Sequence, residues 1–269
     1  MKIATWNVNG VRARAPEVLS FIEREHPDVF CLQEIKASAG QVPEGLRDLP
    51  AYWSFWHGNK GYSGVALLLA KATFPARPRF SHPEFDAETR VVQAELGELR
   101  IASIYVPNGG KDFDAKLRFL EGFEKYAASA GATRLVLCGD LNIAREERDV
   151  HPKLQKADQI GTTAVERGLL EKIIGHGLSD VLRNFAPGDD HLFTWWAPWR
   201  NQRERNIGWR IDYVLASPGL RPTSCVAFRE FGTSDHAPVL AEFDFAAPRY
   251  EGAPDEAEPS RPSGQMPLL

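Results

Sequence analysis

The predicted fold is centred on the segment Arg134-Leu135-Val136-Leu137-Cys138-Gly139-Asp140-Leu141-Asn142. Its apolar first half is typical of a buried β-strand, and the glycine marks the end of that strand. Asp140 and Asn142 are two residues apart, so in an extended chain their side chains lie on the same face. A carboxylate and an amide on one face can orient a water molecule and accept its proton. A simple turn is the competing interpretation of the same residues.

The composition is that of a globular protein. The 269 residues are 43% hydrophobic and 25% charged, which suits one large domain. No apolar run approaches the roughly 18 residues that span a bilayer, and no leader-like segment precedes the first strand-like run, so we expect neither a membrane partner nor a signal peptide. Three cysteines, Cys31, Cys138 and Cys225, lack zinc-ligand spacing and are odd in number. We therefore expect a reduced, cytoplasmic setting.

The net charge of −4 has the wrong sign for a protein that coats nucleic acid. A mildly acidic enzyme can still bind DNA where its cations gather on one face. Part of the negative charge lies in the segment 247–269, which is rich in proline, acidic residues, glycine and serine. We expect this segment to be a disordered tail, which leaves one folded domain over residues 1–246.

Hydrophobic periodicity predicts more strands than helices. The predicted strands cover residues 2–7, 29–33, 52–56, 65–69, 91–96, 99–106, 134–137, 192–195, 211–216, 224–231 and 239–245. The predicted helices cover residues 16–25, 112–130 and 163–176, with a long polar loop at 143–161. Since helices follow only some of the strands, we expect mixed sheets with flanking helices rather than a doubly wound parallel sheet.

Polar residues suited to catalysis stand at the ends of six strand-like runs. They are Asn7 with Asn9, Glu34, Tyr105 with Asn108, Asp140 with Asn142, Asp212, and Asp235 with His236. Each has an ordinary explanation when taken singly, such as a turn, a pairing of Asp212 with Arg210, or a packed histidine. Six such coincidences together favour one site on the loops at the edge of a rigid sheet.

The motifs around these residues resemble, in order, those of the exonuclease III family of apurinic/apyrimidinic endonucleases. They are Trp6-Asn7-Val8-Asn9-Gly10-Val11-Arg12-Ala13, Leu32-Gln33-Glu34-Ile35-Lys36, Tyr105-Val106-Pro107-Asn108-Gly109, Gly139-Asp140-Leu141-Asn142-Ile143, Ile207-Gly208-Trp209-Arg210-Ile211-Asp212-Tyr213 and Ser234-Asp235-His236-Ala237-Pro238. The resemblance covers residues 1–246. Single motifs also occur in the wider deoxyribonuclease I-like group, but the first and fifth are typical of its DNA-repair branch.

The resemblance implies a four-layer α/β sandwich in which two packed mixed β-sheets are flanked by helices. It also implies a hydrolase that cuts 5′ to abasic sites in duplex DNA, with 3′-phosphodiesterase and 3′-to-5′ exonuclease activity. The implied partner is duplex DNA with abasic sites or 3′ ends, and we expect a monomer without a nucleotide cofactor. A phosphoinositide- or sphingomyelin-type phosphoesterase and a catalytically inert RNA-binding regulator are the alternatives.

Phosphodiester hydrolysis needs a metal site, and Glu34 is the best candidate ligand for a hard cation such as Mg²⁺ or Mn²⁺. The resemblance implies that Asn7, Asn9 and Asp235 lie nearby. Some relatives carry aspartate where this chain has Asn9, so we favour one catalytic ion over two.

The remaining polar residues fit the roles of base, hydrogen-bond donor and orienting group. We expect Asp140, helped by Asn142, to orient the attacking water and take its proton. His236 is expected to donate a hydrogen bond to the scissile phosphate while Asp212 orients its ring. Tyr105 and Asn108 are expected to contact phosphate oxygens.

Four tryptophans and four arginines are interleaved within the segment 195–210 and indicate a DNA-binding surface. We expect at least two of Phe193, Trp195 and Trp196 to be core residues, and the segment 200–206 to be an exposed basic loop. Trp209 resembles the residue that lines the abasic-sugar pocket of the family, and a baseless sugar is cheaper to extrude than a paired nucleotide. The predicted DNA contacts, including those to phosphates, are Asn108, Trp209, Arg210, Arg205, Arg203, Arg90 and Lys36.

Overall fold

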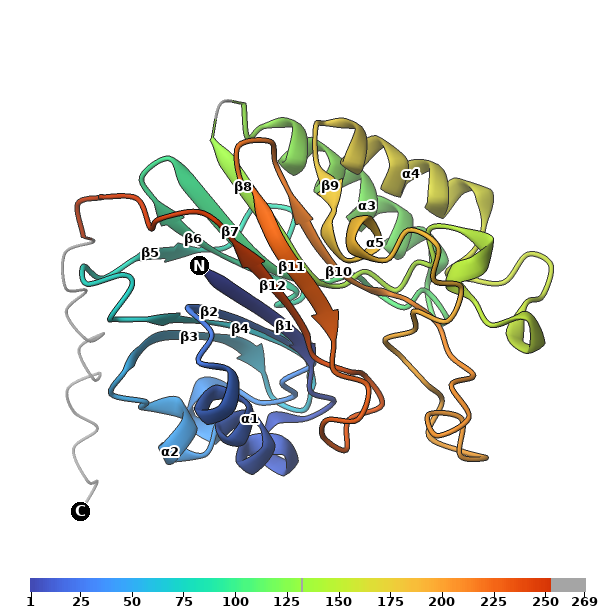
Figure 1. Cartoon of the computed structure of the whole chain (residues 1–269), viewed down its shortest axis with the longest axis horizontal. Helices are drawn as coiled ribbons and strands as arrows, with labels where there is room; N and C mark the ends of the chain where they lie inside the picture. Colours follow the sequence, from blue (N-terminus) through green and yellow to red (C-terminus); the bar gives the residue numbers. More distant parts are fainter. Residues whose placement is uncertain (132, 253–269) are drawn as a thin grey trace, which may run out of the picture.

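The computed structural model describes residues 1–131 and 133–252, and in them two six-stranded sheets lie face to face (Figure 1). The first sheet has the order β11-β12-β1-β2-β4-β3, formed by Pro222–Ala227, Val239–Phe243, Lys2–Asn7, Val29–Gln33, Tyr62–Ala70 and Tyr52–Asn59. The second has the order β5-β6-β7-β8-β10-β9, formed by Arg79–Ser81, Val91–Leu96, Leu99–Tyr105, Arg134–Asp140, Asp212–Ala216 and Ser179–Asp180. Both sheets are mixed, since β1–β2 and β7–β8 are parallel and the other neighbouring pairs are antiparallel.

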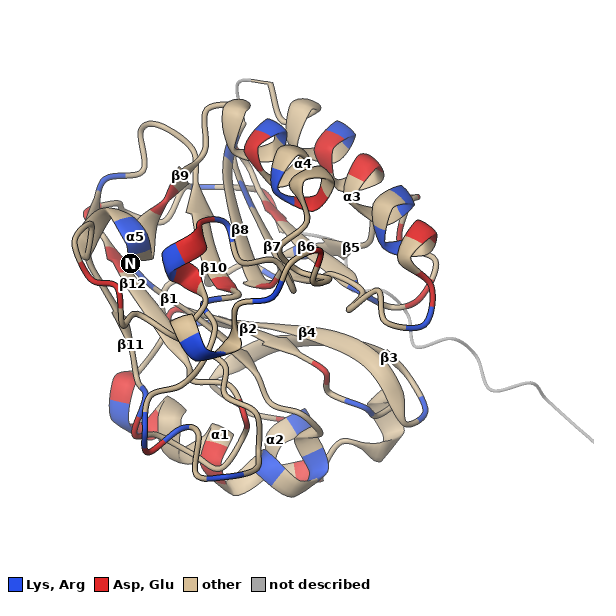
Figure 2. Ribbon diagram, turned by 90° about the vertical axis from the view of Figure 1, so that its right-hand side faces the viewer, with Lys and Arg blue, Asp and Glu red and all other residues tan. Residues whose placement is uncertain are grey.

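Helices cover the outer face of each sheet. On one side lie α1 (Val11–Glu25) and α2 (Glu44–Arg47), and on the other α3 (Phe113–Ala128) and α4 (Ala164–Gly175), while α5 (Val181–Phe185) contacts β10 and β11. Three apolar clusters fill the spaces between sheet and sheet and between each sheet and its helices. Charged residues gather on the helices, and the strands between them are mostly uncharged (Figure 2). The predicted four-layer α/β sandwich is confirmed.

The helices α3 and α4 follow the sequence prediction, and each begins at a capping side chain. The Asp112 carboxylate accepts a hydrogen bond from the Ala115 amide, and Thr163 forms a reciprocal capping box with Glu166. The hairpin predicted at 91–106 is formed by β6 and β7, and Gly97 between them has a φ of 65°. Short 3₁₀ turns at Ala39–Gln41, Glu147–Asp149 and Pro152–Leu154 were not predicted.

The first helix begins earlier than predicted. Its predicted start was Pro16, but α1 begins at Val11. Val11 and Ala15 are buried and extend the stripe of Val18 and Ile22 on the same helix face, so their packing favours the extra turn. Pro16 lies on the exposed side of that helix.

The strand expected to end before Gly139 continues through it to Asp140 as β8. Two other predicted strands differ more strongly from the structure. Residues 192–195 form no strand, because Trp195 makes only isolated bridges to Trp209 and His236. The strand predicted at 224–231 ends at Ala227, since the chain then turns so that Phe231 packs against the Trp6 ring. The elements β5, β9, α2 and α5 are short and were missed by the sequence prediction.

The three cysteines are buried and free, as expected from their number and spacing. Within the described residues, the structure contains no helix with the length and apolar character needed to cross a membrane. Of the predicted tail, residues 247–252 are described, and there the Tyr250 hydroxyl donates a hydrogen bond to the Ala76 carbonyl. Residues 253–269 lie outside the described part, and the boundary at residue 246 stays a prediction.

Candidate active site

The polar residues predicted from six strand ends meet at one end of the sandwich. In the second sheet, Asp140 stands beside both Tyr105 of β7 and Asp212 of β10 in the strand register. The first sheet contributes the ends of the parallel strands β1 and β2. They surround a pocket of about 590 Å³ lined by Glu34, Tyr105, Asn108, Asp140, Asn142, Gln159, Ile160, Trp195, Trp209, Ile211, Asp235 and His236.

Asp140 lies at the centre of the site and is 1% exposed. Its Oδ2 accepts a hydrogen bond of 2.9 Å from Asn7 Nδ2, which reaches across from the other sheet. Its Oδ1 accepts one of 2.9 Å from the Asn142 backbone amide, and Asn142 Nδ2 lies 3.2 Å from Oδ2. The carboxylate is therefore held by both sheets and by its own turn.

The backbone around Asp140 explains the residue types there. Gly139 has a φ of 149°, and a Cβ on it would stand 1.8 Å from the Ile104 carbonyl oxygen of the parallel strand. Only glycine fits so close to that neighbouring backbone. Asn142 has a φ of 50°, in the left-handed region that asparagine tolerates better than most residues. This turn folds the Asn142 side chain back over the carboxylate.

Burial raises the pKa of Asp140 to about 7; the nearby His236 charge opposes this rise, whereas Asp212 and Glu34 add to it. A group with a pKa near neutrality can accept a proton during a reaction near pH 7 and release it afterwards. The environment of Asp140 therefore suits a general base.

His236 lies between two carboxylates. Its Nδ1 is 2.9 Å from Asp212 Oδ2, and its Nε2 is 3.8 Å from Asp140 Oδ2. Burial lowers the pKa of His236, but Asp212 and Asp140 outweigh this and raise it to about 10. Thr194 Oγ1 accepts a hydrogen bond from the backbone amide of Asp212 and so fixes the start of β10. The ring is a cation at neutral pH, with one N–H directed toward Asp140 and the pocket.

The Glu34 carboxylate forms the second charged centre. Oε1 accepts hydrogen bonds from Tyr105 Oη at 2.8 Å and Asn7 Nδ2 at 3.1 Å, and Oε2 forms a 2.7 Å ion pair with Lys36. Burial acts to raise the pKa of Glu34, but Lys36, Asn7 and Tyr105 together hold it below its usual value. Burial and Glu34 raise the pKa of Tyr105, which keeps its phenol protonated.

The oxygens beside Glu34 fit a cation. The Lys36 ammonium lies 2.7 Å from Glu34 Oε2 and 2.5 Å from Asn9 Oδ1, so this set already binds one positive charge. Carboxylate and amide oxygens are the ligands that hard divalent ions prefer. Asn9, Glu34 and Lys36 all have φ values between 45° and 50°, and such strained residues cluster at functional sites. Asp140, Asp212 and His236 form a second group whose ligand atoms all lie within 4.8 Å of one another.

Comparison with known proteins agrees with this geometry. Residues 4–236 match the model of the Endonuclease/Exonuclease/phosphatase family. The chain belongs to that family. It is 33% identical over 251 residues to the DNA repair nuclease APEX1 of Danio rerio, covering 89% of this chain and 81% of the relative. It is 32% identical over 248 residues to the exodeoxyribonuclease of Bacillus subtilis, covering 89% and 98%. The resemblance to the exonuclease III branch is thereby confirmed.

Another family member is longer than this chain. Recombination repair protein 1 of Drosophila melanogaster is 32% identical over 254 residues, which are 91% of this chain and 37% of the relative. Among solved structures, an AP endonuclease from Archaeoglobus fulgidus matches with a TM-score of 0.82 and 31% identity, over 91% of this chain and 100% of that chain. A Neisseria 3′ phosphatase bound to a product DNA hairpin matches with a TM-score of 0.82 and 29% identity, over the same shares.

The predicted contact between Arg210 and DNA is wrong. Arg210 is fully buried and forms ion pairs of 2.8 Å with Asp149 and with Asp180. Trp209 and Ile211 line the pocket, so the side chain between them faces the opposite way, as alternation along an extended chain requires. Arg210 therefore cannot meet DNA, and Asp212 is left free to pair with His236.

The other arginines predicted to contact DNA differ in exposure and in the hydrogen bonds that they already make. Arg205 is exposed. The Arg203 guanidinium donates to the backbone carbonyls of Phe231 and Ser234 among others, so it holds the loop that carries His236. Arg90 is 3% exposed and stacks on the Tyr105 ring, and its Nη1 has no hydrogen-bond partner among the described residues. DNA contact by these residues stays a prediction.

Aromatic side chains form one wall of the pocket. Trp209 is 8% exposed and meets the Trp195 ring edge-on, with ring centroids 6.3 Å apart. The Trp195 indole donates a 2.9 Å hydrogen bond to Asp235, whose other oxygen accepts Asn9 Nδ2 at 2.8 Å. Phe193 and Trp196 are buried, so the expected core role holds for these two. Trp195 instead lines the site.

Sequence reasoning missed one buried lysine beside the site. Lys116 of α3 has no exposed surface and forms a 2.6 Å ion pair with Glu166. Its ammonium also donates to the Asn142 carbonyl at 2.8 Å and to the Asn108 carbonyl at 3.3 Å. Burial lowers the pKa of Lys116 against the effect of Glu166. No local sequence pattern marks Lys116, because the loops that contain Asn108 and Asn142 come into contact with it only in the folded chain.

Proposed function

We propose that this chain is a DNA-repair phosphodiesterase that incises the backbone 5′ to abasic sites in duplex DNA, with 3′-phosphodiesterase and 3′-to-5′ exonuclease activity. The observation that carries the proposal is the Asp140–His236 pair, a base with a pKa of about 7 beside a buried imidazolium, at the floor of a tryptophan-walled pocket. The kinship with exodeoxyribonucleases and AP endonucleases supports it.

In the proposed mechanism, Asp140 orients the attacking water and accepts its proton. Asn7 and the Asn142 turn fix the carboxylate, so its free lone pairs face the pocket. Holding the base and the water in one geometry removes much of the entropy cost of the attack. Asn142 contributes by position, since its amide lies against both Asp140 and Asn108.

His236 and Tyr105 supply hydrogen-bond donors for the phosphoryl oxygens. The imidazolium places its Nε2–H beside the pocket, and Asp212 on Nδ1 keeps the ring protonated and oriented. The Tyr105 phenol keeps its proton because its pKa is raised, and it donates a hydrogen bond to Glu34; it would contact a phosphoryl oxygen by turning the O–H from Glu34 to the substrate. Fixed donors directed at developing negative charge are the largest common source of rate enhancement in such sites.

Glu34, together with Asn7, Asn9 and Asp235, would hold one Mg²⁺ or Mn²⁺ ion. When bound, this ion would neutralise charge on the phosphate. Asp235 also orients Asn9, since one of its oxygens accepts the Asn9 amide. Lys36 lies against the same oxygens and would move aside or share them. Removing divalent ions with EDTA should therefore abolish incision, and added Mg²⁺ should restore it.

The pocket also supports the choice of substrate. Its Trp195–Trp209 wall and volume of about 590 Å³ suit an extruded sugar that carries no base. We infer that duplex DNA binds across the pocket mouth as a complex with one copy of the chain. The three free, buried cysteines suit a reducing compartment, and we propose a cytoplasmic location.

One assay separates the proposed function from its alternatives. The purified protein is incubated with Mg²⁺ and either a duplex carrying one tetrahydrofuran abasic analogue, an intact duplex with recessed 3′ ends, or an inositol phosphate. We expect a nick on the 5′ side of the analogue, slower removal of 3′ nucleotides and no release of phosphate from the inositol. Turnover of the inositol phosphate alone would establish the phosphoesterase alternative, and binding to RNA without any turnover would establish the inert regulator.

A further inference from the structure

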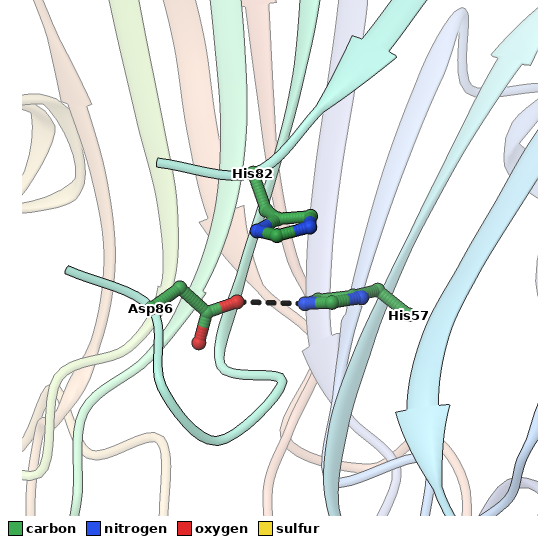
Figure 3. A group of neighbouring side chains, drawn as sticks. All are labelled: His57, His82 and Asp86. Atoms are coloured by element: carbon green, nitrogen blue, oxygen red, sulfur yellow. Dashed lines mark hydrogen bonds and ion pairs between the residues drawn. The ribbon is translucent and has the colours of Figure 1, made fainter. Parts of the chain in front are cut away.

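A second cluster of ligand-type side chains lies outside the pocket, where the two sheets present their open edges. His57 belongs to β3, the edge strand of the first sheet, and His82 follows β5, the edge strand of the second. Asp86 lies in the loop between β5 and β6 (Figure 3). The three residues offer ligand atoms that all lie within 4.8 Å of one another, and none of them lines the active-site pocket.

The carboxylate of this cluster is buried and charged. The Asp86 side chain has no exposed surface, and its Oδ2 lies 2.7 Å from His57 Nε2. Its Oδ1 accepts a 2.7 Å hydrogen bond from the Arg90 backbone amide. Burial acts to raise the pKa of Asp86, but the contacts with His57 and with the Arg90 amide hold it below its usual value. An ionised carboxylate is thus fixed next to an imidazole.

The imidazole of His82 stacks on that of His57. The ring centroids lie 4.6 Å apart and the ring planes are 13° from parallel. His82 is exposed and makes no hydrogen bond through its ring nitrogens among the described residues, whereas His57 Nε2 is bonded to Asp86. In Figure 3 both rings present a nitrogen on the side of the Asp86 carboxylate. A ring nitrogen without a hydrogen-bond partner can offer its lone pair to a metal ion when the imidazole is neutral.

We propose that His57, His82 and Asp86 bind one transition-metal ion of the zinc class, at a site separate from the catalytic cation. Two imidazole nitrogens and one carboxylate oxygen suit Zn²⁺, Co²⁺ or Ni²⁺, whereas Mg²⁺ prefers oxygen ligands and retains its waters. Three protein ligands leave a position for water, so the ion exchanges with solvent. Because imidazole lone pairs lie in the ring plane, binding requires the exposed His82 ring to turn out of its stack.

An ion bound by His57, His82 and Asp86 should stabilise the folded chain. The ion would link the edge strands of both sheets, beside the stacked Phe55 and Phe80 rings that already connect β3 to β5. It also fixes the loop from His82 to Arg90, whose guanidinium stacks on Tyr105. Since a ligand that binds only the folded chain stabilises it in proportion to the logarithm of its concentration, Ni²⁺ at about 100 times its dissociation constant should raise Tm by on the order of 5 °C.

The test uses the untagged full chain and Ni²⁺ in calorimetric titration with excess Mg²⁺ present. The parent, His82→Ala and His176→Ala are compared. His176 also pairs with a carboxylate, Glu124, but has no second histidine beside it, so it is a matched control. We expect His82→Ala to lose one Ni²⁺ ion per chain or to bind it more weakly by on the order of 100-fold, while His176→Ala matches the parent.

Two further measurements distinguish loss of the metal site from loss of the fold in His82→Ala. Incision of abasic duplex in Mg²⁺ should be unchanged in His82→Ala, which shows that the variant is folded. The Ni²⁺-dependent rise in Tm should be absent from it. Equal Ni²⁺ stoichiometry and affinity in the parent and His82→Ala, or loss of an ion in His176→Ala instead, would overturn the proposal.

Discussion

The replacement Asp140→Asn isolates the proposed base with the least change in shape. The amide has the volume of the carboxylate and can still accept the Asn142 backbone amide, but it cannot take a proton from water. Loss of a general base costs about 10²–10⁴-fold in rate. At about 1.4 kcal/mol for each factor of ten, this corresponds to about 3–5 kcal/mol of transition-state stabilisation.

The same replacement should not weaken the fold at alkaline pH. Burial raises the pKa of Asp140 to about 7, so its ionised form is disfavoured in the folded chain relative to the unfolded one. This raised pKa lowers the free energy of unfolding progressively as pH rises from the unfolded pKa of about 4 to the folded value, and the cost persists above it. Asparagine carries no charge and avoids that cost. At pH 8, Asp140→Asn should therefore have a Tm equal to or above that of the parent.

Single-turnover incision of the abasic-analogue duplex measures the rate, and fluorescence anisotropy in EDTA measures DNA binding. Asp114→Asn makes the same chemical change on the exposed face of α3 and serves as the control. We expect slow incision with unchanged DNA affinity in Asp140→Asn and parental values in the control. Incision within about threefold of the parent, well below the loss expected for a general base, would refute the role of Asp140.

The remaining predictions concern the arginines and the acid stability of the fold. Arg210→Met leaves Asp149 and Asp180 as buried charges that have lost a partner and should cost about 3–5 kcal/mol of unfolding free energy, measured by urea denaturation. Arg205→Ala should instead leave Tm unchanged and reduce the slope of log K against log salt for DNA binding by about one; an unchanged slope would remove Arg205 from the DNA contacts. Burial acts to raise the pKa of Asp149, but Arg210 and Arg183 hold it below its usual value, so its contribution to stability is present above the unfolded pKa of about 4 and is lost as pH falls through the folded value. The stability gap between the parent and Asp149→Asn should accordingly narrow from pH 7 to pH 3, and a constant gap would contradict the ion-pair explanation.

The sequence predicted which polar side chains lie together at the strand ends, but it did not predict which arginines are buried. Asp140 is the last residue of a strand of strong apolar pattern, so its position at the strand end could be deduced locally. Asn142 does lie beside it, but through a left-handed turn rather than the extended chain that the sequence argument assumed. His236 and Asp212 were matched through motifs at strand ends, and the strand register then brings Asp212 beside Asp140. Their pairing depends on the sheet as a whole, which no local pattern specifies.

Arg210 shows why a charge pattern alone misleads. Its neighbours suggested a basic, aromatic DNA-binding surface, but alternation along the chain directs it inward to Asp149, 61 positions away in the sequence. Lys116 is the converse case, since it looks like an ordinary polar residue of an amphipathic helix and is fully buried. In both cases the deciding partner is contributed by a distant segment. The early start of α1 at Val11 was likewise fixed by packing against the sheet rather than by helix propensity.

The pH dependence of single-turnover incision, measured in the parent and in Asp212→Asn, tests the central claim most directly. The Asp140–His236 pair predicts a rate that rises with an apparent pKa near 7, as the base loses its proton, and falls near 10, as the imidazolium loses its own. Without the Asp212 carboxylate, the alkaline limb should move to lower pH, because the main support of the His236 charge is gone. A profile that is flat from pH 6 to pH 8, or an alkaline limb that Asp212→Asn leaves in place, would contradict the account.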